Sequence, residues 1–178
     1  MIVVLAAHPY PGRSRAHRVL AGAVRASADV DFRSLYDLYP DFDIDVAAEQ
    51  RALEAARLVV WMHPLHWYGV PGLLKHWFDK VLVNGWAHGK GGTALHGKDC
   101  LWVVTTGGDE HAYSAEGRHE RAFADYVPPV EQTALYCGMR WLEPVVIHGA
   151  HEVSEAELAA AGERLRNRLE EWRSGEPK

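Results

Sequence analysis

A tyrosine and a histidine follow an apolar segment and a pair of glycines near the middle of the chain, and these residue types can do chemistry together. The segment Leu101–Val104 leads into Thr105–Gly108, and Tyr113 and His119 follow within a dozen residues. A phenol with a pKa of about 10 can donate a proton, and an imidazole with a pKa of about 6.5 can stabilise the phenolate that results. The small residues before them let backbone N–H groups approach a flat ligand closely. The pattern predicts a site for a planar group; its alternative is a surface tyrosine and histidine in a loop.

Two other loops follow apolar segments and carry residues that suit a phosphate and a flat ring. Beyond Ile2–Ala7, the chain offers Ser14, Arg15 and His17 at the start of an expected helix, where free N–H groups and the helix dipole favour an anion. Beyond a further apolar segment, the pair Trp67–Tyr68 can form a wall against a planar ring. Each loop taken alone is also explained by an ordinary capped helix or by aromatic packing.

The three loops together fit a flavin nucleotide, because they supply phosphate donors, an aromatic wall and a backbone cradle at neighbouring strand ends. Hydride that arrives at a flavin ring leaves negative charge near the O2 and N1 edge of the ring. We expect Tyr113 to donate there and His119 to stabilise the resulting tyrosinate. The first loop lacks the strict G-x-G-x-x-G fingerprint of dinucleotide-binding folds, which argues against a typical NAD cradle.

The elements that must position these loops alternate between apolar strands and amphipathic helices. The expected strands are Ile2–Ala7, Val30–Leu35, Leu58–Met62, Leu101–Val104 and Trp141–His148. The expected helices begin near Ser14, Val46, Pro71, Pro129 and Ser154. This alternation requires right-handed crossovers and a parallel sheet covered on both faces. The sequence predicts an α/β, flavodoxin-like domain, with a five-stranded parallel sheet and helices on both faces, over residues 1–178.

The composition narrows the functional classes further. With 178 residues, 48% of them hydrophobic and 24% charged, the chain is typical of one globular domain, and its formal charge of −5 argues against a nucleic-acid binder. Neither a signal peptide nor a membrane-spanning stretch is recognisable, so we expect a cytoplasmic protein. We expect Cys100 and Cys137 to be buried hydrophobic side chains. The 11 histidines show no ligand spacing such as H-E-x-x-H, and we expect no metal.

Four motifs distributed over nearly the whole chain have a specific pattern. They are A-H-P-Y at Ala7–Tyr10, A-E-Q-x-x-L-E-A-A at Ala48–Ala56, H-P-L-H-W-Y-G-V-P-x-L-L-K-x-W-F-D-K-V at His63–Val81, and T-T-G-G-x-x-x-x-Y-S-x-x-G-x-H at Thr105–His119. At these residues the chain resembles the flavodoxin-like NAD(P)H:quinone oxidoreductases. Within that family, three segments are similar to the ancillary flavoproteins of bacterial glutathione-gated potassium-efflux antiporters. These segments are Ser34–Asp45, Gly85–Lys98 and Tyr136–Gly138.

The resemblance implies an enzyme that takes electrons from NAD(P)H and reduces quinones two electrons at a time, in a ping-pong cycle on a bound flavin. FMN is the expected flavin and FAD the second choice, because the chain lacks the C-terminal extension of longer FAD-dependent relatives. The residues matching the family's phosphate and ribityl contacts are His8, Ser14, Arg15, Ala16 and His17. Those that would surround the isoalloxazine ring are Leu65, His66, Trp67, Tyr68, Thr105, Thr106, Gly107 and Gly108. Tyr113 and His119 match the family's catalytic tyrosine–histidine pair.

The resemblance also implies partners. Family members are homodimers with the site at the subunit interface, so we expect a homodimer. As an alternative function, the chain would bind and activate a glutathione-gated potassium-efflux antiporter, and this partner would hold it at the inner membrane. A one-electron flavodoxin shuttle is a weaker alternative, because such shuttles carry a more strongly acidic face than a formal charge of −5 suggests.

Overall fold

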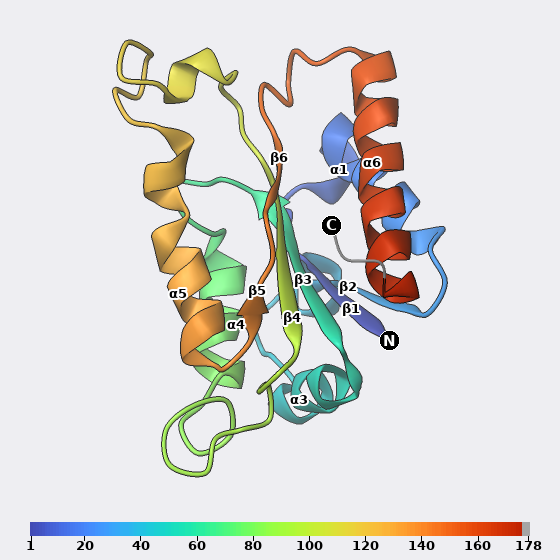
Figure 1. Ribbon diagram of the computed structural model, residues 1–178, viewed down its shortest axis with the longest axis vertical. Coiled ribbons are helices and arrows are strands. Elements are labelled where there is room, and N and C mark those ends of the chain that lie inside the picture. The colour runs from blue at the N-terminus through green and yellow to red at the C-terminus, as the bar shows by residue number, and fades with distance from the viewer. Residues whose placement is uncertain (176–178) are drawn as a thin grey trace.

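The centre of the molecule is a parallel β-sheet. A computed structural model describes residues 1–175, and the last residues of the predicted domain, 176–178, lie outside the described part. The strand order is β2-β1-β3-β4-β5, and β6 also pairs with β4 (Figure 1). The strands are β1 (Ile2–Ala6), β2 (Val30–Ser34), β3 (Leu58–Pro64), β4 (Asp99–Thr105), β5 (Arg140–Trp141) and β6 (Val145–Ile147). All pairs are parallel, which confirms the predicted doubly wound, flavodoxin-like sheet.

The three inner strands are mostly apolar because helices cover both of their sides, and their polar residues Asp99, His63 and Thr105 lie at or near strand ends. Every residue of β1 and β4 is buried, and so is every residue of β3 except Pro64. Near-continuous apolar runs are typical of parallel strands buried on both faces. The edge strand β2 is only half-buried along its length, and it is correspondingly more polar.

The fifth position of the sheet differs from the prediction of one strand over Trp141–His148. It is divided into two short strands, of which β5 pairs with the start of β4 and β6 pairs with its end. Pro144 lies between them. Proline has no backbone N–H to donate to a neighbouring strand, which accounts for the interruption of the ladder.

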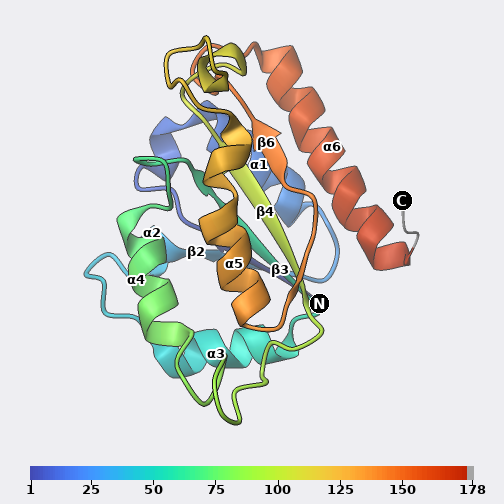
Figure 2. The same cartoon turned by 60° about the vertical axis from the view of Figure 1, so that its left-hand side comes forward.

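Helices form a layer on each face of the sheet (Figures 1 and 2). The helices are α1 (Arg15–Arg25), α2 (Leu35–Leu38), α3 (Val46–Ala55), α4 (Gly72–Val81), α5 (Pro128–Tyr136) and α6 (Glu155–Ser174). Helices α1 and α6 pack in one hydrophobic cluster, and α3, α4 and α5 pack in the other. The helix starts agree with the predicted ones within about two residues. None of the helices within residues 1–175 is long and apolar enough to cross a membrane.

A buried carboxylate joins α3 to the sheet and to α4. The Glu49 side chain is fully buried and accepts hydrogen bonds from Arg33 of β2 and from Trp77 Nε1 of α4, at 2.6 and 3.0 Å. The Tyr39 hydroxyl also donates to it. A buried charge is tolerable only when it is paired and hydrogen-bonded in this way.

Candidate functional site

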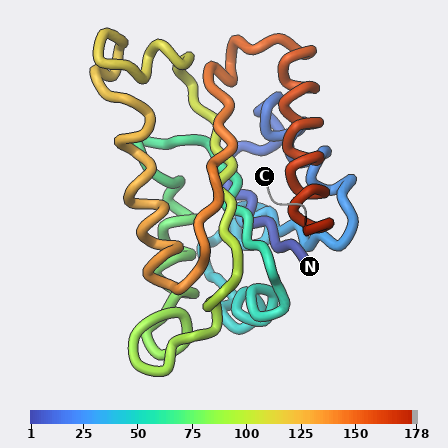
Figure 3. Tube along the Cα trace, in the orientation of Figure 1, coloured from blue at the N-terminus to red at the C-terminus, as the bar shows by residue number. Residues whose placement is uncertain are grey.

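The predicted loops meet at one end of the sheet, drawn at the top of Figures 1 and 3. The loops that follow β1, β3, β4 and β6 leave the carboxyl ends of neighbouring strands there. Ligands of open α/β sheets bind at such a strand-end crevice. Two adjoining cavities lie between these loops, each of about 390 Å³.

The first cavity is built around the start of α1. Ser14 is the N-cap of this helix, and its Oγ accepts a hydrogen bond from the His17 N–H at 3.1 Å. The N–H groups of Arg15 and Ala16, in the first turn, have no partner within the helix. Arg13 and Arg15 add positive charge to the lining. Free N–H groups, a helix dipole and two guanidinium groups form a donor set that suits a phosphate.

Arg15 also contacts the backbone of the loop after β6. Its guanidinium donates to the backbone carbonyl oxygens of His151 and Val153, at 3.2 and 2.9 Å. These contacts hold the loop after β6 against α1. Arg15 therefore shapes the cavity wall and also contributes positive charge to it.

The second cavity contains the predicted catalytic pair. The predicted site residues in its lining are Leu65, Trp67, Tyr68, Gly107, Gly108, Tyr113 and His119. Leu65, Gly107 and His151 line both cavities, so the two are continuous along the strand ends. Together they have a phosphate-binding end and an aromatic end, as a flavin nucleotide requires.

Trp67 and Tyr68 form an unusual turn at the mouth of the second cavity. His66 and Gly69 exchange backbone hydrogen bonds of 3.0 and 2.9 Å, which closes a two-residue hairpin turn. Both central residues have left-handed backbone angles, with φ of 48° at Trp67 and 63° at Tyr68. Such positions favour glycine or asparagine. The Trp67 side chain is 94% exposed and the Tyr68 side chain about half exposed.

The glycine pair forms a cradle that a side chain would fill. A Cβ atom on Gly108 would lie 2.9 Å from the Ala112 Cβ and 3.4 Å from the His119 Nε2. A Cβ atom on Gly107 would point toward His151, 3.6 Å from its ring, where the two cavities join. The absence of these side chains leaves the backbone of the loop open to a flat ligand.

Tyr113 and His119 lie against each other, but not in a hydrogen bond. Their ring centroids are 4.5 Å apart with an interplanar angle of 34°. The His119 Nδ1 atom instead lies 3.4 Å from the Tyr68 hydroxyl. Burial raises the pKa of Tyr113, so the phenol is protonated at neutral pH. The site thus holds a second phenol, Tyr68, that the prediction placed only in the ring-binding wall.

Ala16 and His17 are the two predicted cofactor-binding residues that line neither cavity. Ala16 is buried under α1, and the buried His17 ring packs 5.2 Å from the His8 ring. His8 itself lines the first cavity. Burial lowers the pKa of both His8 and His17 to about 4, so both rings are neutral at pH 7.

Several lining residues were missed by the sequence analysis. They are Tyr10, Arg13, Pro64, Ala150 and His151 in the first cavity and Arg118 in the second. Ala150 and His151 follow β6, and the rule that sites form after strand ends could have indicated them. Arg118 lies directly before His119, and no sequence pattern indicated that it would line the cavity.

The two cysteines line neither cavity. Cys100 and Cys137 are both buried as predicted, and burial raises the pKa of both thiols. Over residues 1–175, no three or more His, Cys, Asp or Glu side chains are grouped so that they could hold a metal ion.

Comparison with known proteins identifies the family. The sequence profile of a family described as a flavodoxin-like fold matches residues 1–169. The chain belongs to this flavodoxin-like family. One similar protein is the glutathione-regulated potassium-efflux system ancillary protein KefF of Salmonella typhi. It is 51% identical to this chain over 172 residues, which cover 97% of each chain.

Solved structures share the flavodoxin-like architecture over nearly the whole chain. A protein described as a thermophilic tryptophan halogenase from Streptomycin violaceusniger has a TM-score of 0.90 and 37% identity, over 94% of this chain and 97% of that one. General stress protein 14 from Treponema denticola, in complex with FMN, has a TM-score of 0.88 and 35% identity, over 95% and 97%. An NADPH-quinone reductase from P. pentosaceus has a TM-score of 0.85 and 25% identity, over 94% and 96%.

Proposed function

We propose that this flavodoxin-like protein is an FMN-dependent NAD(P)H:quinone oxidoreductase. The observation that carries the proposal is the pair of continuous cavities, with phosphate donors around Ser14 at one end and Tyr113 and His119 at the other. The relatives that bind FMN or are named NADPH-quinone reductase support it. Residues 1–178 would act as one domain. FAD remains the second choice of flavin.

The residues present fit FMN along its length. Ser14 and the first N–H groups of α1 would hold the phosphate, with His8 and His66 nearby in the same cavity. The backbone of Thr105–Gly108 would lie against the ring, because glycines leave that surface open. The turn Trp67–Tyr68 would form the opposite wall.

The chain's own residues would then assist two-electron chemistry. Bound FMN supplies a ring that accepts a hydride from NAD(P)H and passes it to a quinone. Tyr113 holds a proton at neutral pH and can donate it where negative charge develops, then recover it in the second half of the cycle. His119, against the Tyr113 ring, is placed to stabilise the phenolate electrostatically.

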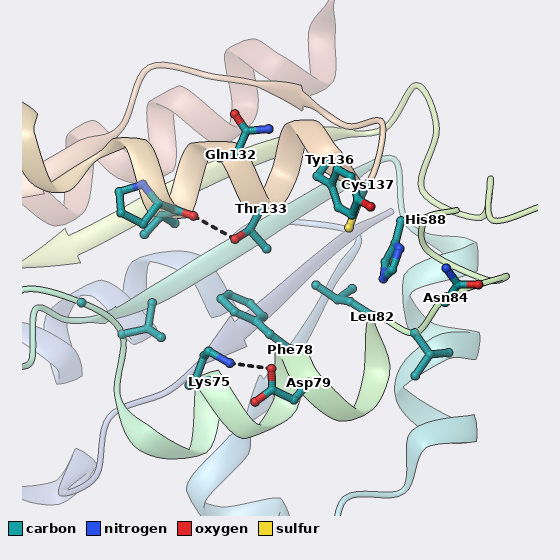
Figure 4. A pocket seen from close by; sticks show the side chains of 15 residues that line it. Lys75, Phe78, Asp79, Leu82, Asn84, His88, Gln132, Thr133, Tyr136 and Cys137 are labelled. Carbon is teal, nitrogen blue, oxygen red and sulfur yellow. Dashed lines mark hydrogen bonds and ion pairs between the residues drawn. The ribbon is translucent and has the colours of Figure 1, made fainter. Parts of the chain in front are cut away.

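We also propose that the protein works as a homodimer. The exposed aromatic side chains include Trp67 and Tyr136, at 94% and 65% exposure. An apolar groove of about 930 Å³ lies between α4 and α5, where Phe78 and Leu82 face Tyr136 (Figure 4). Apolar surfaces of this extent mark interaction sites. Light scattering after size-exclusion chromatography tests this: a particle of one chain's mass, 19.9 kDa, would contradict the homodimer.

The central experiment is a set of rate and binding measurements on the flavin-loaded protein. The purified protein should be yellow, release FMN on heating, and oxidise NAD(P)H in the presence of a simple quinone. In stopped-flow measurements, Tyr113→Phe and His119→Ala should each slow flavin reduction by about 10-fold to 100-fold and change the FMN dissociation constant little. Tyr36→Phe, which alters a phenol outside the two cavities, is the matched control and should leave the rate unchanged.

A flavin-loaded protein that never oxidises NAD(P)H would contradict the enzymatic function. Unchanged reduction rates in both variants would contradict the roles of Tyr113 and His119 alone. Heating releases the flavin for identification, so the same preparation distinguishes FMN from FAD.

A second candidate function is supported by the 51% identity to a potassium-efflux ancillary protein. In this role the protein would bind a glutathione-gated potassium-efflux antiporter from the cytoplasm and activate it, staying at the membrane only through that partner. Co-expression with such an antiporter should increase potassium efflux. Efflux that is unchanged on co-expression would contradict this role without affecting the enzymatic one.

A further inference from the structure

The phenol of Tyr113 needs a hydrogen-bond donor whenever it becomes a phenolate. His119 is not hydrogen-bonded to it in the described chain, because the His119 Nδ1 lies near the Tyr68 hydroxyl instead. Two residues not assigned to catalysis lie near this pair. His148, after β6, has its ring centroid 5.4 Å from that of Tyr113, and Thr106, directly after β4, has its hydroxyl 2.9 Å from the His148 ring.

The Thr106 hydroxyl is buried and has two polar neighbours. The residue is 1% exposed, and its Oγ1 donates to the Gly108 carbonyl oxygen at 2.8 Å. The His148 Nδ1 lies 2.9 Å from the same Oγ1. Because the single hydroxyl hydrogen points to Gly108, the His148 Nδ1 must carry a hydrogen and donate it to Thr106. This arrangement assigns the tautomer of the His148 ring.

The backbone holds Thr106 and His148 together. The Thr106 N–H donates to the Ile147 carbonyl oxygen, and the Ala150 N–H donates to the Thr106 carbonyl oxygen, both at 2.9 Å. The His148 ring lies 5.4 Å from the Tyr113 ring and edge-on to Phe123 at 5.3 Å. A side chain held on both sides in this way can keep one orientation toward its neighbour.

We propose that Thr106 and His148 are positioning residues for Tyr113, with Thr106 as the hydrogen-bond donor that its phenolate uses. The inference rests on the proposed function. Tyr113 would pass its proton to the bound group where negative charge develops, and it would take a proton back in the second half of the cycle. While it is a phenolate, the Thr106 hydroxyl turns from the Gly108 carbonyl to the phenolate oxygen and donates to it, and in this turn only hydrogen bonds change. The His148 Nδ1–H keeps donating to Thr106 Oγ1, which polarises the hydroxyl and makes it a stronger donor.

The charges around the group agree with this arrangement. Burial and the neighbouring phenols Tyr126 and Tyr68 raise the pKa of Tyr113, and the Thr106 side chain is the neighbour that lowers it. Burial lowers the pKa of His148, so the ring is neutral at pH 7, although Asp109 and Glu110 oppose the shift. A neutral His148 donates from Nδ1 without adding a full charge beside the phenol.

The test is the pKa of Tyr113 itself, followed in the full chain labelled with 13Cζ-tyrosine. Carbon NMR titration reports each phenol, and loss of one signal in Tyr113→Phe assigns Tyr113. In flavin-free protein, Thr106→Val, which removes only the hydroxyl, should raise the Tyr113 pKa by about 1. The separate variant Thr106→Ser retains the hydroxyl, and its Tyr113 pKa should equal the wild-type value. His148→Leu should raise the pKa less than Thr106→Val does, and His148→Asn should raise it least.

An unchanged Tyr113 pKa in both Thr106→Val and His148→Leu would overturn the inference. If Thr106→Val fails to fold, judged by circular dichroism, His148→Leu decides the result, and an unchanged Tyr113 pKa in that variant overturns the inference. In the flavin-loaded protein, Thr106→Val should also lower kcat at least about 10-fold without raising KM for the quinone. The NMR result does not depend on turnover: a protein without quinone reductase activity would contradict the proposed function, and the proposed Thr106–Tyr113 hydrogen bond could still be measured.

Discussion

At the scale of single residues, the most consequential groups outside the site are polar side chains held inside the core. Glu49 on α3 is an example, since Arg33, Tyr39 and Trp77 all donate to its carboxylate. These donors come from β2, the segment after α2, and α4. Removing the carboxylate would leave the half-buried Arg33 guanidinium with Asp31 as its remaining partner. It would also leave the buried donors of Tyr39 and Trp77 without their acceptor.

We therefore expect Glu49→Ala to destabilise the fold strongly. The expected loss in the free energy of unfolding is about 3–5 kcal/mol, as for other buried ion pairs that lose one partner. Urea denaturation followed by circular dichroism measures it. Glu170→Ala, which removes an exposed carboxylate 3.9 Å from Arg166, is the matched control and should change stability by less than about 0.5 kcal/mol. Equal effects of the two substitutions would contradict this account of Glu49.

His63 on β3 gives the protein a pH-dependent stability. The Trp102 Nε1 donates to the His63 Nε2 at 2.7 Å, so the Nδ1 carries the hydrogen and donates to the Pro64 carbonyl oxygen at 2.9 Å. Burial lowers the pKa of this histidine to about 4. In the unfolded chain its pKa is about 6.5, so between these values the unfolded state binds more protons. Stability is therefore complete above about pH 6.5 and is lost as the pH falls toward 4.

The test compares the pH dependence of the free energy of unfolding in the wild type and in His63→Gln. Between about pH 7 and pH 5, His63 should account for a loss of about 2 kcal/mol in the wild type. His63→Gln keeps an acceptor for Trp102 but does not titrate, so its loss over this range should be smaller by that amount. His8 and His17, whose pKa values are also lowered, contribute in the same direction in both proteins. A variant with the wild-type pH dependence would show that His63 is not the titrating group.

At the scale of elements, the hairpin turn after β3 combines local strain with a functional position. Its central residues Trp67 and Tyr68 both have positive φ. For residues with a Cβ atom this conformation costs roughly 1–2 kcal/mol each. Two aromatic side chains in such a turn are explained by the wall that they form at the second cavity.

Relief of this strain is measurable at Trp67, which is 94% exposed and makes few contacts. Trp67→Asn should raise the free energy of unfolding by roughly 0.5–1 kcal/mol, because asparagine tolerates the left-handed conformation. Trp67→Ala also removes the ring but is strained in the same backbone, so it should bring no gain. Urea denaturation of the three proteins decides it, and equal stability of the asparagine and alanine variants would contradict the strain. Both variants should also raise KM for the quinone.

At the scale of the whole molecule, the site exists only in the folded chain. It is assembled from loops after β1, β3, β4 and β6, which are distant in sequence. A ligand that bridges them binds the folded state and not the unfolded one. Its binding free energy therefore adds to the stability of the whole fold.

FMN should therefore stabilise the protein against unfolding. At free FMN about 100 times its dissociation constant, the gain should be about 2.7 kcal/mol. Riboflavin, which has the ring but no phosphate, should give a smaller gain at the same concentration, because the first cavity supplies donors for a phosphate. Thermal unfolding with each ligand measures the difference. Equal gains from the two would place the phosphate outside this cavity.

Much of the fold could be predicted from local pattern. Apolar runs such as Ile2–Ala6 and Leu101–Val104, and the N-caps Ser14 and Ser154, depend on neighbouring residues and are visible in the chain. The division of the fifth strand was missed, although Pro144 was its visible signal. The types of residue at the site were visible too, because they follow the strand ends directly.

The contacts inside the site were not predictable, since they join residues far apart in the chain. Tyr68 and His119 are 51 positions apart, and Thr106 and His148 are 42 apart. Which loops meet is decided by strand order, and how their side chains meet is decided by register and by the paths of the loops. Residue types and their periodicity are local properties that can be read from the chain alone. The partners of a phenol or an imidazole depend on three-dimensional packing, and only the tertiary structure provides that.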